Sequence, residues 1–251
     1  MQGAQSIHRA VALIGAIARQ NSEGARLSDL AAAVGLKTAT AHRILRALVA
    51  AGFVAQSVNQ KVYRLGSELY ALGRQAKEFD LRSRYEPLLV DLAEQTGDSV
   101  YLSVRAGHDA VYVEHVSGSY PIRVLPFDVG SRWPLGIGAP GIAILSALPA
   151  TESERIIQMN APRYPKIKGV IADEVRRFVD AARRHGYAYN HRRFINSIAG
   201  ISVPILDRDS EPVAAVSIVA IASRLDVKRR KKVAEIMTRQ LAKISERAAA
   251  P

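Results

Sequence analysis

The fold of the N-terminal region is decided by the stretch Leu27-Ser-Asp-Leu-Ala-Ala-Ala-Val-Gly-Leu-Lys-Thr-Ala-Thr-Ala-His-Arg-Ile-Leu-Arg-Ala-Leu-Val-Ala-Ala-Gly-Phe53. In its first part, apolar residues fall at the i, i+3, i+4 and i+7 positions of one helix face, namely Leu27, Leu30, Ala31 and Val34. Ser28 or Asp29 can cap the start of this helix, and Gly35 can end it in a left-handed conformation. The stretch therefore predicts a short helix with one buried face.

A second helix follows a sharp corner and begins near Lys37 and Thr38. The same spacing predicts that it buries Ala41, Ile44, Leu45 and Leu48. Its other face is polar, cationic and mostly short-chained, as a helix must be to enter a major groove roughly 12 Å wide. The pair predicts a helix-turn-helix that reads double-stranded DNA, although a surface helical hairpin with a solvated basic face is the alternative. The predicted DNA contacts on it are Lys37, Thr38, Thr40, His42, Arg43 and Arg46.

A short β-hairpin is predicted directly after this second helix. Gly52 stops the helix, and two short strands follow around a polar tip, with Val54 expected to pair with Tyr63. Helix, turn, helix and hairpin in this order make a winged helix-turn-helix. Lys61 and Arg64 are the charges that would position the wing on a phosphate backbone. The hairpin could instead only close the small core.

The composition favours an anionic partner. The chain of 251 residues carries a net charge of +12, with a net of +5 in residues 1–80 and +6 in residues 224–247. The basic run at residues 228–232 is either a second nucleic-acid patch or, as we prefer, the solvated face of an amphipathic helix. The sequence has no cysteine, which excludes disulfides and thiol chemistry. No apolar run approaches the ~20 residues of a membrane span, and no signal peptide is evident, so we expect a soluble, cytoplasmic protein without membrane contact.

The other predicted N-terminal elements are helices separated by loops. A first helix is predicted from the spacing of Ile7, Ala10, Val11, Ile14 and Ile17, and these residues should pack against the two helices of the helix-turn-helix. Residues 21–26 are expected to form the loop after it. Residues 67 to about 82 are predicted as a linker helix that also offers a dimer surface, although packing within one chain would produce the same apolar stripe. A further helix should follow, with Pro87 tolerated in its first turn and Gly97 just after its end.

The second half of the chain predicts an α+β domain built on one sheet. Strands are expected at residues 100–104, 111–116 and 122–127, followed by a glycine- and proline-rich loop at 130–141 and an apolar helix at 142–147. Thr151 and Glu154 have the spacing of a capping box. A helix ended by Gly186, a hairpin of residues 201–206 and 213–221, and a long C-terminal helix complete the domain. Such a domain is large enough to enclose a ligand.

The chain resembles transcriptional regulators of the IclR type over nearly its whole length. In the first eighty residues the matching segments are Ser6-Ile-His-Arg-Ala-Val-Ala-Leu-Ile14, Leu27-Ser-Asp-Leu-Ala31, Gly35-Leu, Thr40-Ala-His-Arg-Ile-Leu45 and Tyr63-Arg-Leu-Gly66. In the second domain they are Gly97, Val129-Gly130, Trp133-Pro-Leu135, Gly141-Ile-Ala-Ile-Leu145, Arg184-His-Gly-Tyr187, Pro212-Val-Ala-Ala-Val-Ser217 and Ser223-Arg-Leu225. No one motif is decisive, but the series in the family's order is specific.

The resemblance implies a winged helix-turn-helix DNA-binding domain at residues 1–66, a linker helix at 67–84 and a GAF-like effector-binding domain at 85–251, with a mostly antiparallel sheet flanked by helices. It implies a homodimer, often paired into a tetramer, that binds partly palindromic promoter DNA and represses or activates transcription. A pocket would sense a small metabolite, commonly an organic or aromatic acid. Carried over by position, its contacts are Gly138, Ala139, Pro140, Asn190, Gly200, Ser217 and Val219.

Several of these positions depart from the family's usual pattern. Members that sense small oxo-acids often have Asp, Cys and a second Ser where this chain has Asn190, Gly200 and Val219. Pro140 also lacks the backbone donor that would help to grip a carboxylate. Fewer donors and more apolar wall predict a larger, less polar effector, although the pocket could also be shaped differently or have lost its ligand. In the second helix of the stretch, Thr38 and Ala39 stand where the family often has Lys and Ser.

Two other classes of function are compatible with parts of the sequence. The sequence disfavours an enzyme. Its six histidines include no pair with the spacing of metal ligands, and the sequence contains no nucleophile elbow, P-loop or Rossmann fingerprint. We therefore expect no catalysis, metal or cofactor. The best of the weak histidine candidates are His115 and His191. An architectural or RNA-binding protein could use the basic surface without sequence choice. RNA readers usually display stacking aromatics, however, and none lies on the predicted reading face.

Overall fold

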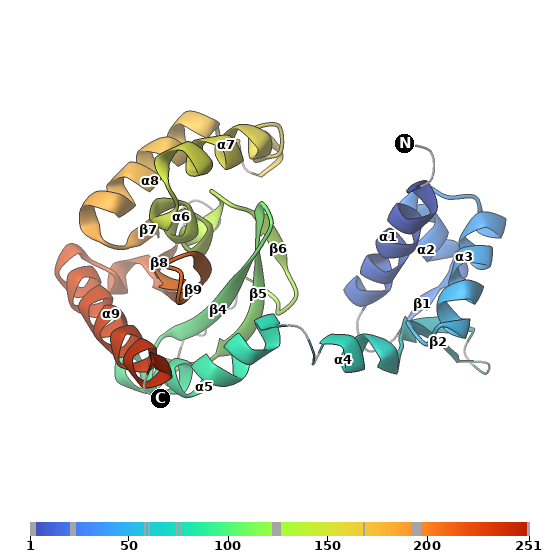
Figure 1. Cartoon of the computed structure of the whole chain (residues 1–251), viewed down its shortest axis with the longest axis horizontal. Coiled ribbons are helices and arrows are strands. Elements are labelled where there is room, and N and C mark those ends of the chain that lie inside the picture. Colours follow the sequence, from blue (N-terminus) through green and yellow to red (C-terminus); the bar gives the residue numbers. More distant parts are fainter. Residues whose placement is uncertain are drawn as a thin grey trace. The chain divides into compact units, whose positions relative to one another are not determined.

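The computed structural model describes residues 4–20, 24–57, 59, 61–73, 75, 77–121, 127–167, 169–191 and 197–249. The chain divides into two compact units, Met1–Phe79 and Asp80–Pro251, which are described separately below. Figure 1 shows the elements of each unit in sequence colours.

The N-terminal unit packs helices against a small antiparallel sheet. Its elements are α1 (Gln5–Arg19), β1 (Ala25–Arg26), α2 (Leu27–Val34), α3 (Thr38–Ala50), β2 (Val54–Ser57), β3 (Val62–Leu65) and α4 (Ser67–Gly73). The strand order is β1-β3-β2. The core joins Leu13 and Ile17 of α1 with Leu30, Leu45 and Tyr63. Gly35 ends α2 with a φ of 67°, so the predicted helix-turn-helix and its left-handed corner are confirmed.

The structure corrects three details around this core. The predicted cap of α2 is wrong, because Arg26 occupies the N-cap position and Ser28 donates its hydroxyl to Asp29. The hairpin register is also wrong, because Val54 lies opposite Leu65, and Tyr63 faces Gln56. The four-residue connection between Ser57 and Val62 sets this register. Finally, the end of the predicted loop at 21–26 forms β1, which is too short to show any periodicity in the sequence.

The predicted burial of α1 is partly wrong. Leu13, Ala16 and Ile17 are buried, whereas Ile7 and Val11 are 66% and 62% exposed. The sequence of this helix contains two neighbouring apolar stripes, and periodicity alone does not show which of them faces the core. One apolar stripe of α1 therefore remains on the surface.

The helix predicted over residues 67 to about 82 is two helices in the structure. The first, α4, ends at Gly73, and α5 (Lys77–Thr96) begins four residues later. Pro87 lies in the interior of α5 instead of its first turn. A proline there lacks the amide hydrogen that would bond to the previous turn, yet the helix continues to Thr96 and ends, as predicted, just before Gly97.

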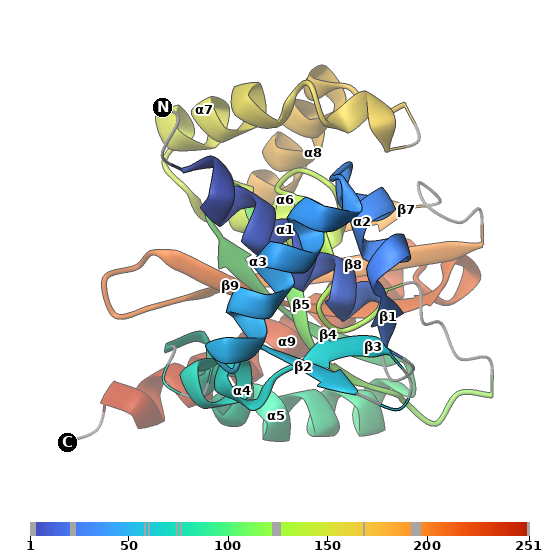
Figure 2. The same cartoon turned by 90° about the vertical axis from the view of Figure 1, so that its right-hand side faces the viewer.

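The C-terminal unit is a six-stranded antiparallel sheet with helices on both faces (Figures 1 and 2). The strand order is β6-β5-β4-β9-β8-β7. The strands are β4 (Ser99–Ala106), β5 (Asp109–Val116), β6 (Arg132–Pro134), β7 (Ala188–His191), β8 (Ile198–Leu206) and β9 (Pro212–Ile221). The helices after α5 are α6 (Gly138–Ala147), α7 (Ala150–Asn160), α8 (Ala172–His185) and α9 (Val227–Ala249), with short 3₁₀ turns at Tyr164–Lys166 and Ala222–Arg224. The predicted α+β class with an antiparallel sheet is confirmed.

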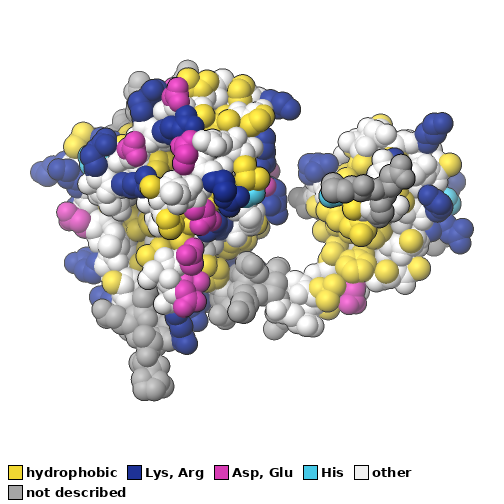
Figure 3. Space-filling view, turned by 45° about the horizontal axis from the view of Figure 1, so that its top comes forward, with side chains coloured by type: hydrophobic (Ala, Val, Ile, Leu, Met, Phe, Trp, Pro, Cys, Tyr) yellow, Lys and Arg dark blue, Asp and Glu magenta, His cyan; other side chains and the backbone are white. Residues whose placement is uncertain are grey.

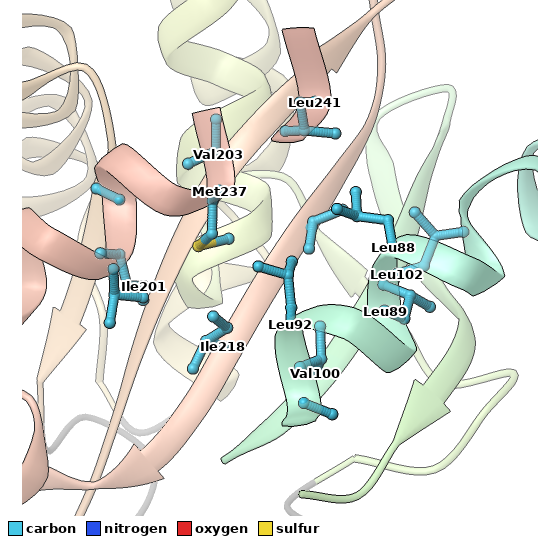
Figure 4. Packing of buried hydrophobic residues seen from close by; sticks show 14 of the residues in the cluster. Leu88, Leu89, Leu92, Val100, Leu102, Ile201, Val203, Ile218, Met237 and Leu241 are labelled. Atoms are coloured by element: carbon cyan, nitrogen blue, oxygen red, sulfur yellow. The ribbon is translucent and has the colours of Figure 1, made fainter. Parts of the chain in front are cut away.

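One face of this sheet is covered by α5 and α9. In Figure 4, Leu88, Leu89 and Leu92 of α5 and Met237 and Leu241 of α9 lie against strand residues. The strand residues labelled there are Val100, Leu102, Ile201, Val203 and Ile218. The opposite face is covered by α6, which packs on β7, β8 and β9, with α8 against α6. Because neighbouring residues of a strand point to opposite faces, each strand contributes to both layers.

Several predictions for this unit need correction. Residues 132–134 of the predicted loop form β6, and α6 begins at Gly138, four residues earlier than predicted. The predicted capping box is wrong, because α7 begins at Ala150 and Glu154 instead binds Arg176 of α8. The strand β7 was not predicted. The strand expected at 122–127 lies, except for Phe127, outside the described residues. In the described ranges, no helix is long and apolar enough to cross a membrane.

Candidate functional site

The face of α3 that is predicted to contact DNA lies on the surface of the N-terminal unit. Lys37, Thr38, His42, Arg43 and Arg46 are exposed, and Thr40 is half-buried. The opposite face of α3 packs Ala41 and Leu45 into the core, and Ile44 and Leu48 are half-buried there. Within the part of the chain that the structure describes, neither Arg43 nor Arg46 forms an ion pair. No surface salt bridge therefore gives Arg43 a structural role in this part of the chain, and its guanidinium is available to an anionic partner.

The wing is held next to the end of α3 by backbone contacts. The Phe53 amide donates to the Leu48 carbonyl at 3.0 Å, and the Gly66 amide donates to the Phe53 carbonyl at 2.9 Å. Lys61 lies at the tip of the hairpin, exposed, with a φ of 52°. A non-glycine residue in this left-handed region is under strain, and such strain often occurs at functional positions. The structure thus presents the Lys61 ammonium at the tip of the wing.

In the C-terminal unit, the sheet register brings together residues far apart in sequence. Asn190 of β7 lies opposite Gly200 of β8, and Gly200 lies opposite Val219 of β9. The first turn of α6 lies over this row, because a Cβ built on Gly200 would be 3.6 Å from the Ala139 Cβ and 3.9 Å from a Val219 methyl. Four of the seven predicted effector contacts, Ala139, Asn190, Gly200 and Val219, are thus grouped or adjoining. The full set, called the candidate effector site below, is Gly138, Ala139, Pro140, Asn190, Gly200, Ser217 and Val219.

The remaining members of the set lie beside this row. Gly138 and Pro140 are buried in the same first turn of α6. Ser217 is two residues before Val219 on β9 and therefore faces the same side of the sheet. Its hydroxyl donates to the Ser202 hydroxyl at 3.0 Å, and Ser202 donates to the Val216 carbonyl at 2.8 Å. Both serines are fully buried and hydrogen-bonded, whereas Oδ1 of Asn190 is buried and has no partner among the described residues.

An aromatic cluster adjoins Val219 on the same side of the sheet. Tyr101 lies opposite Ser217, and its ring is 5.5 Å from that of Tyr112 in an edge-to-face contact. Tyr112 stacks on Phe127 at 4.6 Å, and Phe127 meets Trp133 at 5.9 Å. Burial raises the pKa of Tyr101 to about 12, and it raises the pKa of Tyr112 further, so both phenols stay neutral. The cluster gives this part of the site an apolar, uncharged wall.

Sequence reasoning did not identify these aromatic residues as part of the site. They alternate with the core residues of β4 and β5, so the alternation itself was available as a signal. Which aromatics meet depends on the strand register, in which a β-bulge between Leu102 and Ser103 places Ser103 opposite Tyr112. Trp133 comes from the segment predicted as a loop, and Phe127 is the last residue of the strand expected at 122–127. A cluster of this kind therefore becomes visible only once the strands are paired.

The entry to α6 is fixed by buried hydrogen bonds. Tyr164 donates its hydroxyl to the Leu135 carbonyl at 2.6 Å, and Asn160 donates to the His108 carbonyl at 2.8 Å. Gly136 has a φ of 103°, and a Cβ there would be 2.6 Å from the Tyr164 hydroxyl, so no other residue fits. These contacts set the position of the first turn of α6 over the sheet. Its amides at Gly138 and Ala139 are among the donors at a helix start that lack intrahelical partners.

Among the side chains that the structure describes, which exclude that of His191, the histidines form no metal-binding cluster. Over the described ranges, no group of three or more His, Asp or Glu side chains is arranged to hold a metal ion. His115 packs its ring on Tyr101 at 4.6 Å, and burial lowers its pKa despite the neighbouring Glu114, which acts in the opposite direction. His115 is therefore neutral near pH 7 and belongs to the aromatic cluster. The side chain of His191 lies outside the described set.

A helix-turn-helix unit followed by an antiparallel-sheet unit with a shielded, mixed polar and aromatic face defines a class of transcriptional regulators with a separate effector-binding domain. Residues 6–57 match the family described as the IclR helix-turn-helix domain, and residues 73–246 match the bacterial transcriptional regulator IclR C-terminal family. The chain belongs to the IclR family of transcriptional regulators.

Individual relatives support this assignment. The glycerol operon regulatory protein of Streptomyces coelicolor is 33% identical over 222 residues, which cover 88% of this chain and 86% of that protein. The HTH-type transcriptional regulator KipR of Bacillus subtilis is 29% identical over 201 residues, 79% of each chain.

Solved structures show the same fold. The IclR-type regulator of Alicyclobacillus acidocaldarius has a TM-score of 0.79 at 22% identity, covering 96% of this chain and 97% of that chain. An IclR homologue of Microbacterium hydrocarbonoxydans, complexed with 4-hydroxybenzoate, has a TM-score of 0.78 at 22% identity. The match covers 98% of this chain and 100% of that chain.

Proposed function

We propose that this protein binds partly palindromic promoter DNA as a homodimer, which can pair into a tetramer, and that a small acid changes its DNA affinity. The observation that carries the DNA-binding role is the exposed basic face of α3, where Arg43 and Arg46 have no ion-pair partner among the described residues. The major groove admits such a helix, and arginine contacts both phosphates and guanine edges. Lys61 on the wing adds a backbone contact. We place this activity in the cytoplasm, where bacterial promoters lie.

An organic acid with an aromatic ring is the effector class that we favour. None of the seven residues of the candidate effector site is ionisable, and the amides of Gly138 and Ala139 at the start of α6 are suited to a carboxylate. The aromatic cluster beside Val219 offers ring contacts. That a family member of the same fold binds 4-hydroxybenzoate supports the same class. A small oxo-acid has no ring and would make few contacts with these aromatic side chains.

The homodimer is supported by apolar side chains on the surface of the N-terminal unit. Ile7 and Val11 on one face of α1 are 66% and 62% exposed, and Tyr70 and Leu72 of α4 are 68% and 46% exposed. In Figure 3, hydrophobic side chains gather on one side of this unit. Exposed apolar patches commonly mark association sites. A two-fold dimer would hold two α3 helices at half-sites about one helical turn, or a multiple of it, apart.

Regulation requires two arrangements of the protein that differ in effector affinity. We propose residues 1–66 as the DNA-binding domain, 67–84 as the linker and 85–251 as the effector-binding domain. The linker would comprise α4 and the start of α5, with Gln75 between them in a turn. Effector binding would shift the population between the two arrangements. We assign no catalytic step to the protein, in keeping with its regulatory relatives.

Fluorescence anisotropy tests the proposal directly. The full-length protein is titrated onto its own upstream intergenic DNA and onto scrambled DNA at ~150 mM salt, with and without benzoates and small oxo-acids. We expect saturable binding that is at least ~10³-fold tighter to the natural sequence and that changes with one acid. Equal binding to both DNAs would contradict a specific operator.

A non-specific nucleic-acid-binding role is the second candidate. It is favoured by one observation: Lys228, Lys231 and Lys232 at the start of α9 are exposed and form no ion pair with any described residue. Their neighbours are used within the fold, since Arg229 binds Asp98 and Arg230 stacks on Tyr189. Steep salt dependence without sequence preference in the same titration would favour this role.

A further inference from the structure

Asn190, which is half-buried with a buried side-chain oxygen, differs from the fully buried Asn160 of the same unit. The Asn160 amide group donates to the His108 and Leu135 carbonyls, and its oxygen accepts from Arg163 at 2.9 Å. Asn160 is therefore a structural residue with its hydrogen-bonding groups satisfied. The carbonyl oxygen of Asn190 is buried and has no partner among the described residues. A buried acceptor without a partner costs free energy, and folded proteins rarely retain one without a reason.

The strand places this oxygen on the side of the candidate effector site. Tyr189, the preceding residue of β7, stacks with Arg230 of α9 at 3.8 Å and so faces the α9 side of the sheet. Asn190 must then point to the α6 side, because side chains alternate along a strand. There it lies next to Gly200, which has no side chain to donate and which contacts Ala139 and Val219. None of these neighbours offers a side-chain donor to the Asn190 oxygen.

We propose that Asn190 selects the effector by accepting a hydrogen bond from a hydroxyl or amino group that the acid carries in addition to its carboxylate. This inference rests on the proposed function and names the substituent that the site reads. A neutral amide has both donors and an acceptor, so its oxygen can accept from this group without adding a charge to the site. A site built around an unpaired acceptor discriminates strongly against a ligand that lacks the donor.

The test is isothermal titration calorimetry of the full-length protein with benzoate, 3-hydroxybenzoate, 4-hydroxybenzoate and 4-methoxybenzoate. We expect at least one hydroxybenzoate to bind about tenfold or more tightly than benzoate. The methoxy compound, which has no donor, should behave like benzoate. In Asn190→Leu the preference for a hydroxybenzoate over benzoate should disappear, because the hydrogen-bond acceptor is removed. Asn190→Ala also removes the acceptor and should abolish the same preference.

Gln240→Leu is the matched control, because its amide oxygen is also buried without a partner but lies on α9. It should leave the preference intact, and thermal melting shows that each variant is folded. If Asn190→Leu does not fold, Asn190→Ala decides by the same comparison of hydroxybenzoate with benzoate. Acids that bind with no hydroxyl preference, or with one that persists in Asn190→Leu, overturn this inference and leave the proposed function in place. If no acid binds the wild type, the proposed effector class fails as well.

Discussion

Gly66 lies so close to Gly52 that a Cβ at residue 66 would be 2.0 Å from the Gly52 carbonyl oxygen. This contact joins the end of β3 to the end of α3. The Glu68 amide donates to the same carbonyl at 3.3 Å, and Gly66 itself donates to Phe53. No side chain fits between the two backbones. The hairpin of β2 and β3 can therefore take this position beside α3 only when residue 66 is glycine.

Gly66→Ala is therefore expected to destabilise the N-terminal unit by about 1–3 kcal/mol or more, because the obstructing atoms are backbone and cannot move aside. Urea unfolding followed by far-UV circular dichroism measures the loss. Gly15→Ala is the control, since its Cβ would meet only the mobile end of Arg19 at 3.7 Å. That change should be neutral or stabilise α1 by up to ~1 kcal/mol. Equal stability of the two variants would contradict the close contact.

Arg43 should contribute to operator binding without contributing to folding. Its side chain is exposed on α3 and makes no ion pair with a described residue, so Arg43→Ala removes no structural interaction. We expect operator affinity to fall by ~1–3 kcal/mol with unfolding unchanged. Arg184→Ala removes an equally exposed arginine from α8 and serves as the control in anisotropy titrations. A difference of only a few tenths of a kcal/mol between the two variants would dismiss Arg43 as a contact.

Lys61 combines a useful charge with an unfavourable backbone conformation. Its φ of 52° costs roughly 1 kcal/mol for a residue with a Cβ and nothing for glycine. Lys61→Gly should thus leave stability unchanged or raise it slightly, while operator affinity falls and the slope of log K against log salt decreases by ~1. Lys61→Ala, which keeps the strain and loses the charge, separates the two effects. An unchanged salt slope in both variants would show that the wing tip makes no phosphate contact.

The helix-turn-helix could be predicted because local rules coincide there. The apolar period, the left-handed Gly35 and the hairpin after Gly52 all specify the same structure, and tertiary packing only confirms it. The strands β1, β6 and β7 are two to four residues long, too short for any period to appear. They exist because a neighbouring strand offers hydrogen bonds. Likewise, only packing decides that Leu13 and Ile17, rather than Ile7 and Val11, face the core of α1.

The candidate effector site shows the same division. Positions carried over from the family resemblance, such as Ala139, Gly200 and Val219, do gather in the structure. Their role in binding stays a prediction, because no ligand contact tests it. Tyr101 and Tyr112 were not predicted, since their meeting depends on a register that includes a β-bulge. Residue identity can thus indicate the position of a site. The residues that line it can be identified only once the pairing of the strands is known.

Among the charged residues of the C-terminal unit, Asp98 should contribute most to the free energy of unfolding. Its carboxylate is 2% exposed and accepts from Arg224 at 2.8 Å and from Arg229 at 2.6 Å. Asp98→Ala leaves both guanidinium groups without their carboxylate, for which we expect a loss of about 3–5 kcal/mol. Urea unfolding followed by the fluorescence of Trp133, the only tryptophan, measures it. Asp173→Ala removes a carboxylate that is 71% exposed and should cost no more than ~1 kcal/mol.

The ion pair between Glu154 and Arg176 should make the docking of α7 on α8 depend on pH. The hydrogen bonds from Arg176 lower the pKa of Glu154 below its ordinary value of 4.5, with a further contribution from Gln158, and partial burial opposes them. A carboxyl group whose pKa is lowered by folding adds stability above its ordinary pKa and loses it as pH falls through the folded value. Both side chains are more than a third exposed, so we expect at most ~1 kcal/mol.

Glu154→Gln tests this dependence, because it keeps the shape of the side chain and removes its charge. The variant should be less stable than the wild type at pH 7, and the difference should shrink as the pH is lowered from 5 to about 3. Unfolding followed by Trp133 fluorescence across this range gives the difference directly. A gap that stays constant with pH would mean that packing or hydrogen bonding, and not the charge of Glu154, holds the two helices together.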